Sequence, residues 1–125
     1  MHSESIRKFE KNQYINVETF RKNGIGVKTP VWFAQDDDSL VVRTESTSGK
    51  MKRIRNNPQV RVAPCDARGK LLGEWVDAQA EIIADDIEKK RIDRLITEKY
   101  GLIKRFTDIF SKKRKSGYGA FRIRF

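Results

Sequence analysis

Short segments in which apolar and polar residues alternate restrict the fold of this chain more than any other feature. Alternation with a period of two is typical of a β-strand that buries one face. Six segments have strand-like patterns: residues 14–20, 27–35, 40–44, 59–65, 75–84 and 121–125. Asn23-Gly24 separates the first two, and residues 66–70 separate the fourth from the fifth, which predicts two hairpins. The sequence therefore predicts a mainly β fold with an antiparallel sheet.

Helical spacing of apolar residues is confined to three segments. Residues 50–56 are interpreted as a short helix, because a proline follows shortly afterwards and stops it. Asp85, with Glu88 three positions later, predicts the start of a longer helix that ends at Gly101. Residues 102–110 repeat the amphipathic pattern. We therefore expect a C-terminal helical pair before the last strand.

The chain is expected to form one domain, residues 1–125, because no linker, repeat or low-complexity stretch divides it. A terminal strand must pair with strands already formed. Six short strands close most easily into a small barrel that has no long free edge. The first eleven residues contain no apolar run, so neither a signal peptide nor a membrane span is expected there. We expect a cytoplasmic protein.

Composition excludes several kinds of chemistry. Basic residues outnumber acidic ones, 27 to 17, and the formal net charge of +10 favours anionic partners such as phosphates. Cys65 is the only cysteine, so no internal disulfide forms, and one cysteine with one histidine cannot make a metal site. His2 lies in a segment expected to be mobile, which leaves no base for a serine or cysteine nucleophile. Asp36, Asp37 and Asp38 are interpreted as a solvated turn, and no catalytic residue is assigned.

One stretch combines the features of a phosphate site. Residues 43–50 join a strand end, three hydroxyl side chains, Gly49 and Lys50 immediately before a predicted helix. Free N–H groups at a helix start, a glycine that permits close approach and a cationic side chain together can hold one anion. The same residues also fit a simple helix cap with a nearby lysine. A Walker A loop is excluded, because Thr44 and Met51 stand where that motif needs a glycine and a hydroxyl residue.

A second stretch, residues 28–33, contains a proline inside a predicted strand. Pro30 cannot donate a ladder hydrogen bond, so we expect an edge strand or a strand that faces a cofactor. Trp32 would either cover a cofactor ring or fill the core, and the core is the favoured interpretation. The same interpretation applies to Trp75.

Five groups of residues carry a family resemblance through their order and spacing: residues 28–33, residues 40–44, residues 48–50 with Ile54, residues 57–60, and residues 73–76 with Ala80. With these residues, almost the whole chain resembles the pyridoxamine 5′-phosphate oxidase-like superfamily of split β-barrels. Within it, the chain is most similar to enzymes that use the deazaflavin coenzyme F420. The resemblance implies a six-stranded antiparallel split β-barrel. It also implies a homodimer with its coenzyme sites at the subunit interface.

The resemblance further implies which residues line the coenzyme site: Lys28, Thr29, Pro30, Val31, Arg43, Thr44, Ser48, Gly49, Lys50 and Trp75. Ser48, Lys50 and Lys28 are expected at the phosphate. Pro30 and Val31 are expected to face the ring system.

Two other parts of the coenzyme contact follow from the resemblance. Arg43 and Thr44 are expected to position the polar part of the coenzyme, and Trp75 to reach the site from the partner chain.

One departure matters, because pyridoxamine phosphate oxidases proper end with a tryptophan and an Arg-x-His motif that residues 122–125 lack. Vitamin B6 oxidation is therefore not expected. Coenzyme F420 is the expected cofactor, with FMN as the alternative.

The expected activity is hydride transfer between a reduced deazaflavin and an unsaturated organic substrate, for which the coenzyme supplies the reactive chemistry. A non-catalytic coenzyme or tetrapyrrole carrier on the same fold remains an alternative. A second alternative is a nucleic-acid-binding module built on the basic run at residues 112–115. It is disfavoured because short charge runs are more often solvated loops.

Overall fold

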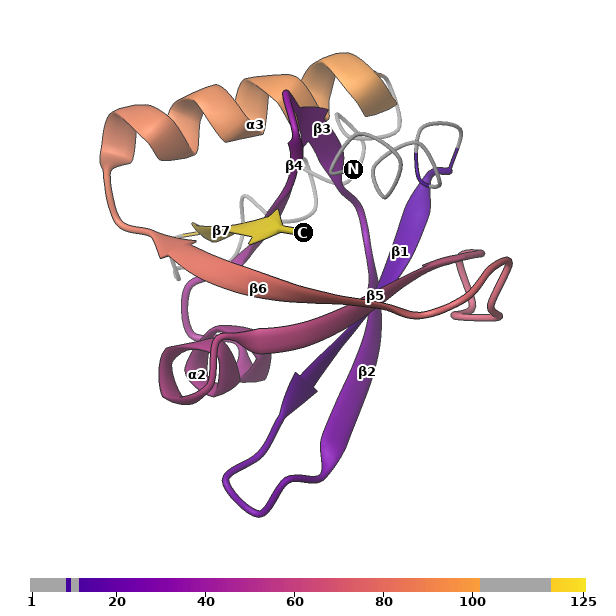
Figure 1. Ribbon diagram of the computed structural model, residues 1–125. Coiled ribbons are helices and arrows are strands. Elements are labelled where there is room, and N and C mark those ends of the chain that lie inside the picture. Colours follow the sequence, from indigo (N-terminus) through magenta and orange to yellow (C-terminus); the bar gives the residue numbers. More distant parts are fainter. Residues whose placement is uncertain (1–8, 10–11, 102–117) are drawn as a thin grey trace.

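The computed structural model describes residues 9, 12–101 and 118–125, and its centre is one antiparallel sheet (Figure 1). Every pair of neighbouring strands within this part of the chain is antiparallel, as the hairpin spacing predicts. The strands are β1 (Tyr14–Phe20), β2 (Gly26–Val31), β3 (Ala34–Asp36), β4 (Ser39–Glu45), β5 (Gln59–Cys65), β6 (Val76–Ile83) and β7 (Tyr118–Arg124). Their order across the sheet is β2-β1-β5-β6-β7-β4-β3. The mainly β class is confirmed.

The two edge strands, β2 and β3, follow one another in the chain, and this relationship gives the sheet its shape. Only Trp32 and Phe33 separate them. Three residue steps span at most about 11 Å, so the sheet curls until its opposite edges come close. No ladder joins those two edges in the described residues, so the barrel is split between β2 and β3. We call the two residues that connect these strands, Trp32 and Phe33, the seam.

The expected split barrel is therefore confirmed as a class and corrected in two details. The described residues form seven strands instead of six, because the predicted strand at residues 27–35 breaks at the seam into β2 and β3. The sheet also stays open, since β2 and β3 are edges that do not pair with each other.

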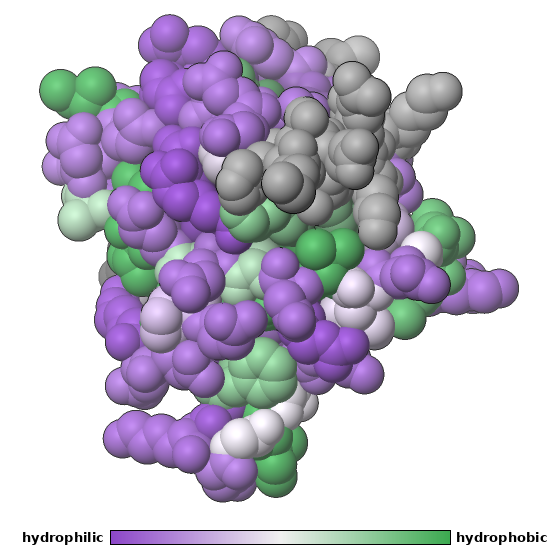
Figure 2. Space-filling model, in the orientation of Figure 1, coloured by the Kyte–Doolittle hydropathy of each residue, from purple (hydrophilic) through white to green (hydrophobic). Residues whose placement is uncertain are grey.

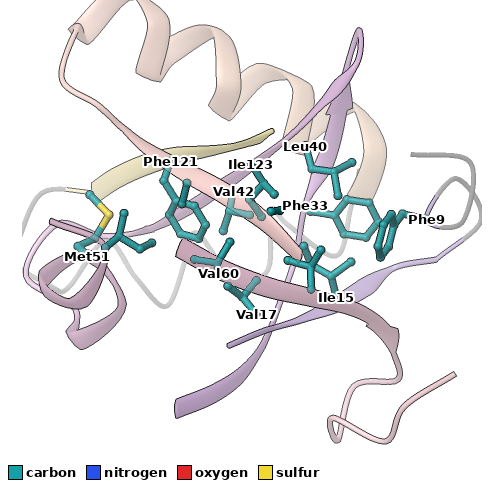
Figure 3. Packing of buried hydrophobic residues seen from close by; sticks show 14 residues of the cluster. Phe9, Ile15, Val17, Phe33, Leu40, Val42, Met51, Val60, Phe121 and Ile123 are labelled. Carbon is teal, nitrogen blue, oxygen red and sulfur yellow. The ribbon is translucent and has the colours of Figure 1, made fainter. Parts of the chain in front are cut away.

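An apolar cluster fills the inside of the curled sheet (Figure 3). Alternate residues of β1, β4 and β5 form its walls, as a period of two requires. Met51 and Phe121 lie toward one end of the cluster, and Phe33 and Phe9 lie at the other. All four side chains are at most 2% exposed, so their burial contributes strongly to stability. The sheet face that borders this cluster is the inner face, and the opposite one is the outer face.

The two helices of the described residues cover different parts of the sheet. Helix α2 (Gly49–Asn56) lies against β1 and β6 at the Met51 end of the cluster. Helix α3 (Asp86–Tyr100) lies across the outer face of β3, β4 and β7 (Figure 1), over a second apolar cluster. As predicted, Asp85 caps α3 by accepting the N–H of Glu88 at 3.1 Å, and Gly101 ends it with a φ of 57°.

The predicted helix at residues 102–110 and the basic run at residues 112–115 lie outside the described residues. Within the described ranges, neither helix has the length and apolar character that crossing a membrane requires.

Asp36 is not a solvated turn residue, contrary to expectation. Its carboxylate accepts hydrogen bonds from Arg91 of α3, at 3.2 Å for Nη1, and from Arg122 of β7, at 2.7 Å. Arg122 also reaches Glu88 at 2.8 Å. The hydrogen bond from Arg91 has the largest effect and lowers the pKa of Asp36. Burial raises this pKa and the hydrogen bond from Arg122 lowers it further, and the resulting pKa is about 2. This network ties α3 and β7 to the edge strand β3.

Candidate functional site

Ser48, Gly49 and Lys50 stand together at the start of α2, as the sequence predicts. The Ser48 hydroxyl is the N-cap and accepts the N–H of Met51 at 3.3 Å. The simple capping interpretation is therefore correct for this hydroxyl, although its proton can still be donated to an anion. Lys50 is half-buried, and burial, followed by the nearby positive charge of Arg53, lowers the pKa of its ammonium group.

Arg53, one turn further along α2, folds back to the start of the helix. Its Nε donates a hydrogen bond of 2.6 Å to the hydroxyl of Thr19, a fully buried residue of β1. Its Nη1 lies 2.7 Å from the position that a Cβ on Gly49 would occupy. The guanidinium group of Arg53 therefore lies in the space that a side chain at position 49 would occupy.

A third cation stands close to Arg53. Burial, followed by the charge of Arg21, lowers the pKa of Arg53. We call Arg21, Lys50 and Arg53 the cationic cluster. Within the described part of the chain, no carboxylate forms an ion pair with any of these three side chains. Three cations without a neutralising acid, beside the positive end of a helix dipole, suit a phosphate group.

The predicted site residues of β2 divide between the two faces of the sheet. Thr29 pairs with Val17, and Val31 pairs with Ile15, so both lie on the inner face that also carries Thr19. Lys28 and Pro30 alternate with them on the outer face. Only Thr29 and Val31 therefore share a face with the residue that binds Arg53.

Arg43 and Thr44 also point to opposite faces of the sheet. Arg43 lies under α3, where its Nε is 3.1 Å from Asp93 and its guanidinium group is 4.7 Å from the ring centre of Tyr118. Thr44 alternates with it and pairs with Gly119, the residue against which Met51 of α2 lies. The structure brings Thr44 toward the start of α2 and directs Arg43 away from it.

The two tryptophans lie in different surroundings. Trp32 stacks on Tyr100, with ring centres 4.4 Å apart and planes at 7°, and contacts the apolar cluster under α3, as expected for a core residue. Trp75 is half-buried on the outer face, with Lys28 Nζ 5.4 Å and Arg61 5.0 Å from its ring centre. The core interpretation is wrong for Trp75, which covers two cations instead.

Three residues of this site, Arg53, Thr19 and Arg21, are not among those predicted from the sequence. Arg53 follows Gly49 by four positions, a spacing that places both on one side of a helix and could have found it. Thr19 and Arg21 carry no such signal, because only the packing of α2 against β1 brings them near Arg53. Hydrophilic residues cover most of the surface in the view of Figure 2, which fits the high charge of the chain.

Solved structures with the same fold exist at low sequence identity, whereas no curated protein sequence matches the chain. The heme storage protein HutZ from Vibrio cholerae superposes with a TM-score of 0.70 at 16% identity, over 98% of this chain and 87% of that one. A FAD-binding protein from Mesorhizobium loti gives 0.67 at 19% identity, over 100% and 87%. An F420-H2 dependent reductase gives 0.62 at 16% identity, over 89% and 93%. These likenesses show the fold alone.

A match at the level of sequence identifies the family. The sequence pattern of the pyridoxamine 5′-phosphate oxidase family covers residues 3–125, which is nearly the whole chain. The resemblance that the motifs predict is thereby confirmed. This chain belongs to the pyridoxamine 5′-phosphate oxidase family.

Proposed function

We propose that this protein is an oxidoreductase that binds a phosphate-bearing deazaflavin, coenzyme F420, with FMN as the alternative cofactor. The observation that carries the proposal is the cationic cluster, whose three cations have no acidic partner among the described residues. Two proteins of the same fold, described as FAD-binding and as an F420-H2 dependent reductase, support a coenzyme of the flavin type.

The residues at the start of α2 fit a phosphate group in charge and in hydrogen-bonding capacity. Lys50 and Arg53 supply cationic donors, and Ser48 retains a hydroxyl proton. Partial burial strengthens these interactions, because the local dielectric constant is lower than that of water. We assign the phosphate to these three residues, with Arg21 adding positive charge.

The ring system is assigned to the inner side of β2. Thr29 and Val31 lie on the same face as Thr19, and Thr44 approaches the same end of the sheet from β4. When bound, the coenzyme supplies the hydride chemistry, and the protein's share is orientation and charge. The proposed reaction is hydride transfer to an unsaturated organic substrate, with no acid or base assigned to the chain.

A homodimer is part of the proposal. Lys28 and Trp75 lie on the outer face, opposite to the face that carries Thr19 and Arg53. They cannot reach a coenzyme on the inner side of their own chain. If they contact the coenzyme, as the family resemblance implies, they do so from a second copy.

Titration of the purified protein with F420 and with FMN, followed by coenzyme fluorescence, tests the proposal. Lys50→Ala and Arg53→Gln should each weaken binding by about 1–3 kcal/mol, the usual value of a charge-assisted hydrogen bond. Lys90→Ala, which removes an exposed lysine from α3, is the matched control and should change nothing. Failure to bind either coenzyme would refute the proposal, and binding without redox turnover would identify a carrier.

A further inference from the structure

One side chain from outside the sheet holds the seam. The hydroxyl of Tyr100, at the end of α3, accepts the N–H of Phe33 at 3.0 Å. The same oxygen lies 2.6 Å from the carbonyl oxygen of Gln13 and 2.9 Å from that of Phe33. Its single proton can be donated to one of these carbonyls at a time. Because burial raises the pKa of Tyr100 to about 12, the donating form persists across the physiological range.

Ring contacts fix the seam further. Trp32 stacks face to face on the ring of Tyr100. The ammonium group of Lys99 lies 3.4 Å from the ring centre of Phe33. Each residue of the seam is therefore held by the last turn of α3, Trp32 through its ring and Phe33 through its backbone and its ring.

The Tyr100 hydroxyl takes the place of a ladder that the sheet lacks. Strands β2 and β3 do not pair, and Phe33 lies between them at 1% exposure. Buried backbone N–H and C=O groups require partners, and here one phenol oxygen serves both groups of Phe33. Because Gln13 directly precedes β1, the same oxygen also links the seam to the strand with which β2 pairs.

We propose that Tyr100 is a positioning residue for the coenzyme, because by holding the seam it fixes β2, the strand whose Thr29 and Val31 face the ring. This inference rests on the proposed function. Tyr100 acts through Phe33, which lies two residues beyond Val31. A strand held in its binding conformation loses less conformational entropy when the coenzyme binds, so affinity depends on the hydroxyl.

Tyr100→Phe tests the inference, because it keeps the stacked ring and removes only the hydroxyl. Two control variants separate this change from general destabilisation. Tyr14→Phe removes the hydroxyl of another ring beside Trp32, one that has no hydrogen-bond partner in the described residues. Ile92→Val loosens the core under α3, against which Trp32 packs, but leaves the hydroxyl of Tyr100 and its contacts with Phe33 and Gln13 in place. Amide hydrogen exchange by NMR and coenzyme affinity are measured for all variants.

In Tyr100→Phe, we expect exchange at the Phe33 amide to rise about tenfold relative to the amide of Val41, because its hydrogen-bond acceptor is gone. Coenzyme binding should weaken about three- to tenfold, as expected for the loss of one net hydrogen bond. Both controls should bind the coenzyme as the wild type does.

Unchanged exchange at Phe33 would overturn the inference, and so would faster exchange with unchanged coenzyme affinity. A wild-type protein that binds neither coenzyme refutes the proposed function, and the positioning role is then refuted with it. In that case faster exchange at Phe33 alone still shows that Tyr100 holds the seam, so the error lies in the coenzyme assignment.

Discussion

The guanidinium group of Arg53 occupies the space that a side chain at Gly49 would need, with Nη1 2.7 Å from the ideal Cβ position. This contact explains why a glycine stands at the start of α2 beside Lys50. The φ angle of Gly49 is not in the left-handed region, so the backbone itself does not require a glycine here. The requirement comes from the arginine that folds back over the helix start.

Gly49→Ala should therefore separate binding from stability. The added methyl group displaces the flexible end of Arg53, and coenzyme affinity should fall about three- to tenfold. The free energy of unfolding should change by less than about 1 kcal/mol, because alanine favours a helix as well as glycine does or better. Fluorescence titration and urea unfolding measure the two quantities. Lys52→Ala, an exposed lysine of the same helix, controls for charge, and equal affinities of Gly49→Ala and wild type would contradict the prediction.

Thr19 positions the same arginine from the neighbouring strand. Thr19→Val keeps the side-chain shape and removes the hydroxyl that accepts from Arg53 Nε. We expect the free energy of unfolding to fall by about 1 kcal/mol and coenzyme affinity to weaken about two- to fivefold, because one hydrogen bond is lost. In an Arg53→Met background, Thr19→Val should have no further effect on affinity, because the two residues act as one unit. An additive effect in that double variant would show that Thr19 contributes independently.

Local patterns in the sequence predict most of the strands and the part of the site that lies at the start of α2. The strand at residues 59–65 and the one at residues 14–20 are confirmed at both ends, because alternation and turn residues mark them. Lys50 could be found for a similar reason, since cap, glycine and lysine are consecutive. The role of Gly49 was missed, although its spacing of four residues from Arg53 on one helix could have indicated it.

Features that arise from contacts between distant segments escape such patterns. Residues 31–34 are an unbroken apolar run, as in a buried strand, so nothing local indicates that the strand ends there. The break depends on Tyr100, 67 residues further along the chain. Asp36 was misread for the same reason, because the arginines that pair with it come from α3 and β7.

The pairing of Asp36 predicts a specific response to acid. The native pKa of about 2 lies below the ordinary value of 3.8, so the stabilisation is complete above pH 3.8 and disappears as pH falls through about 2. After allowance for solvent screening at Arg91, it is on the order of 1–2 kcal/mol. The difference in unfolding free energy between wild type and Asp36→Asn, measured in urea from pH 6 to pH 2, should shrink over that window.

The exposed Asp38 in the same turn offers a matched control. Asp38→Asn should differ little from wild type at any pH, because exposed charges contribute little. A difference between wild type and Asp36→Asn that stays constant down to pH 2 would show that the ion pair does not depend on the charge of Asp36.

Arg122 is the buried centre of this network. It is 9% exposed and donates to Asp36, Ser39 and Glu88. Arg122→Met should cost about 2–4 kcal/mol, because two carboxylates and a hydroxyl lose a donor in a partly desolvated place. Arg124→Met is the matched control. That arginine lies on the same strand, and its one ion pair with a described residue is an exposed pair with Glu81 at 3.4 Å, so its loss should cost less than about 1 kcal/mol.

The double variant of Asp36→Asn with Arg122→Met decides whether the cost comes from an uncompensated charge or from packing. If the unpaired carboxylate dominates, neutralising Asp36 restores part of the stability, and the double variant is more stable than the sum of the single changes predicts, by about 1–3 kcal/mol. If the aliphatic part of Arg122 dominates through its contacts in the sheet, the two costs add. Urea unfolding at pH 7 distinguishes the outcomes, because both carboxylates are ionised in the wild type there. Strictly additive costs would show that Arg122 stabilises the protein through packing. The acid response of Asp36 would then depend on its ion pair with Arg91.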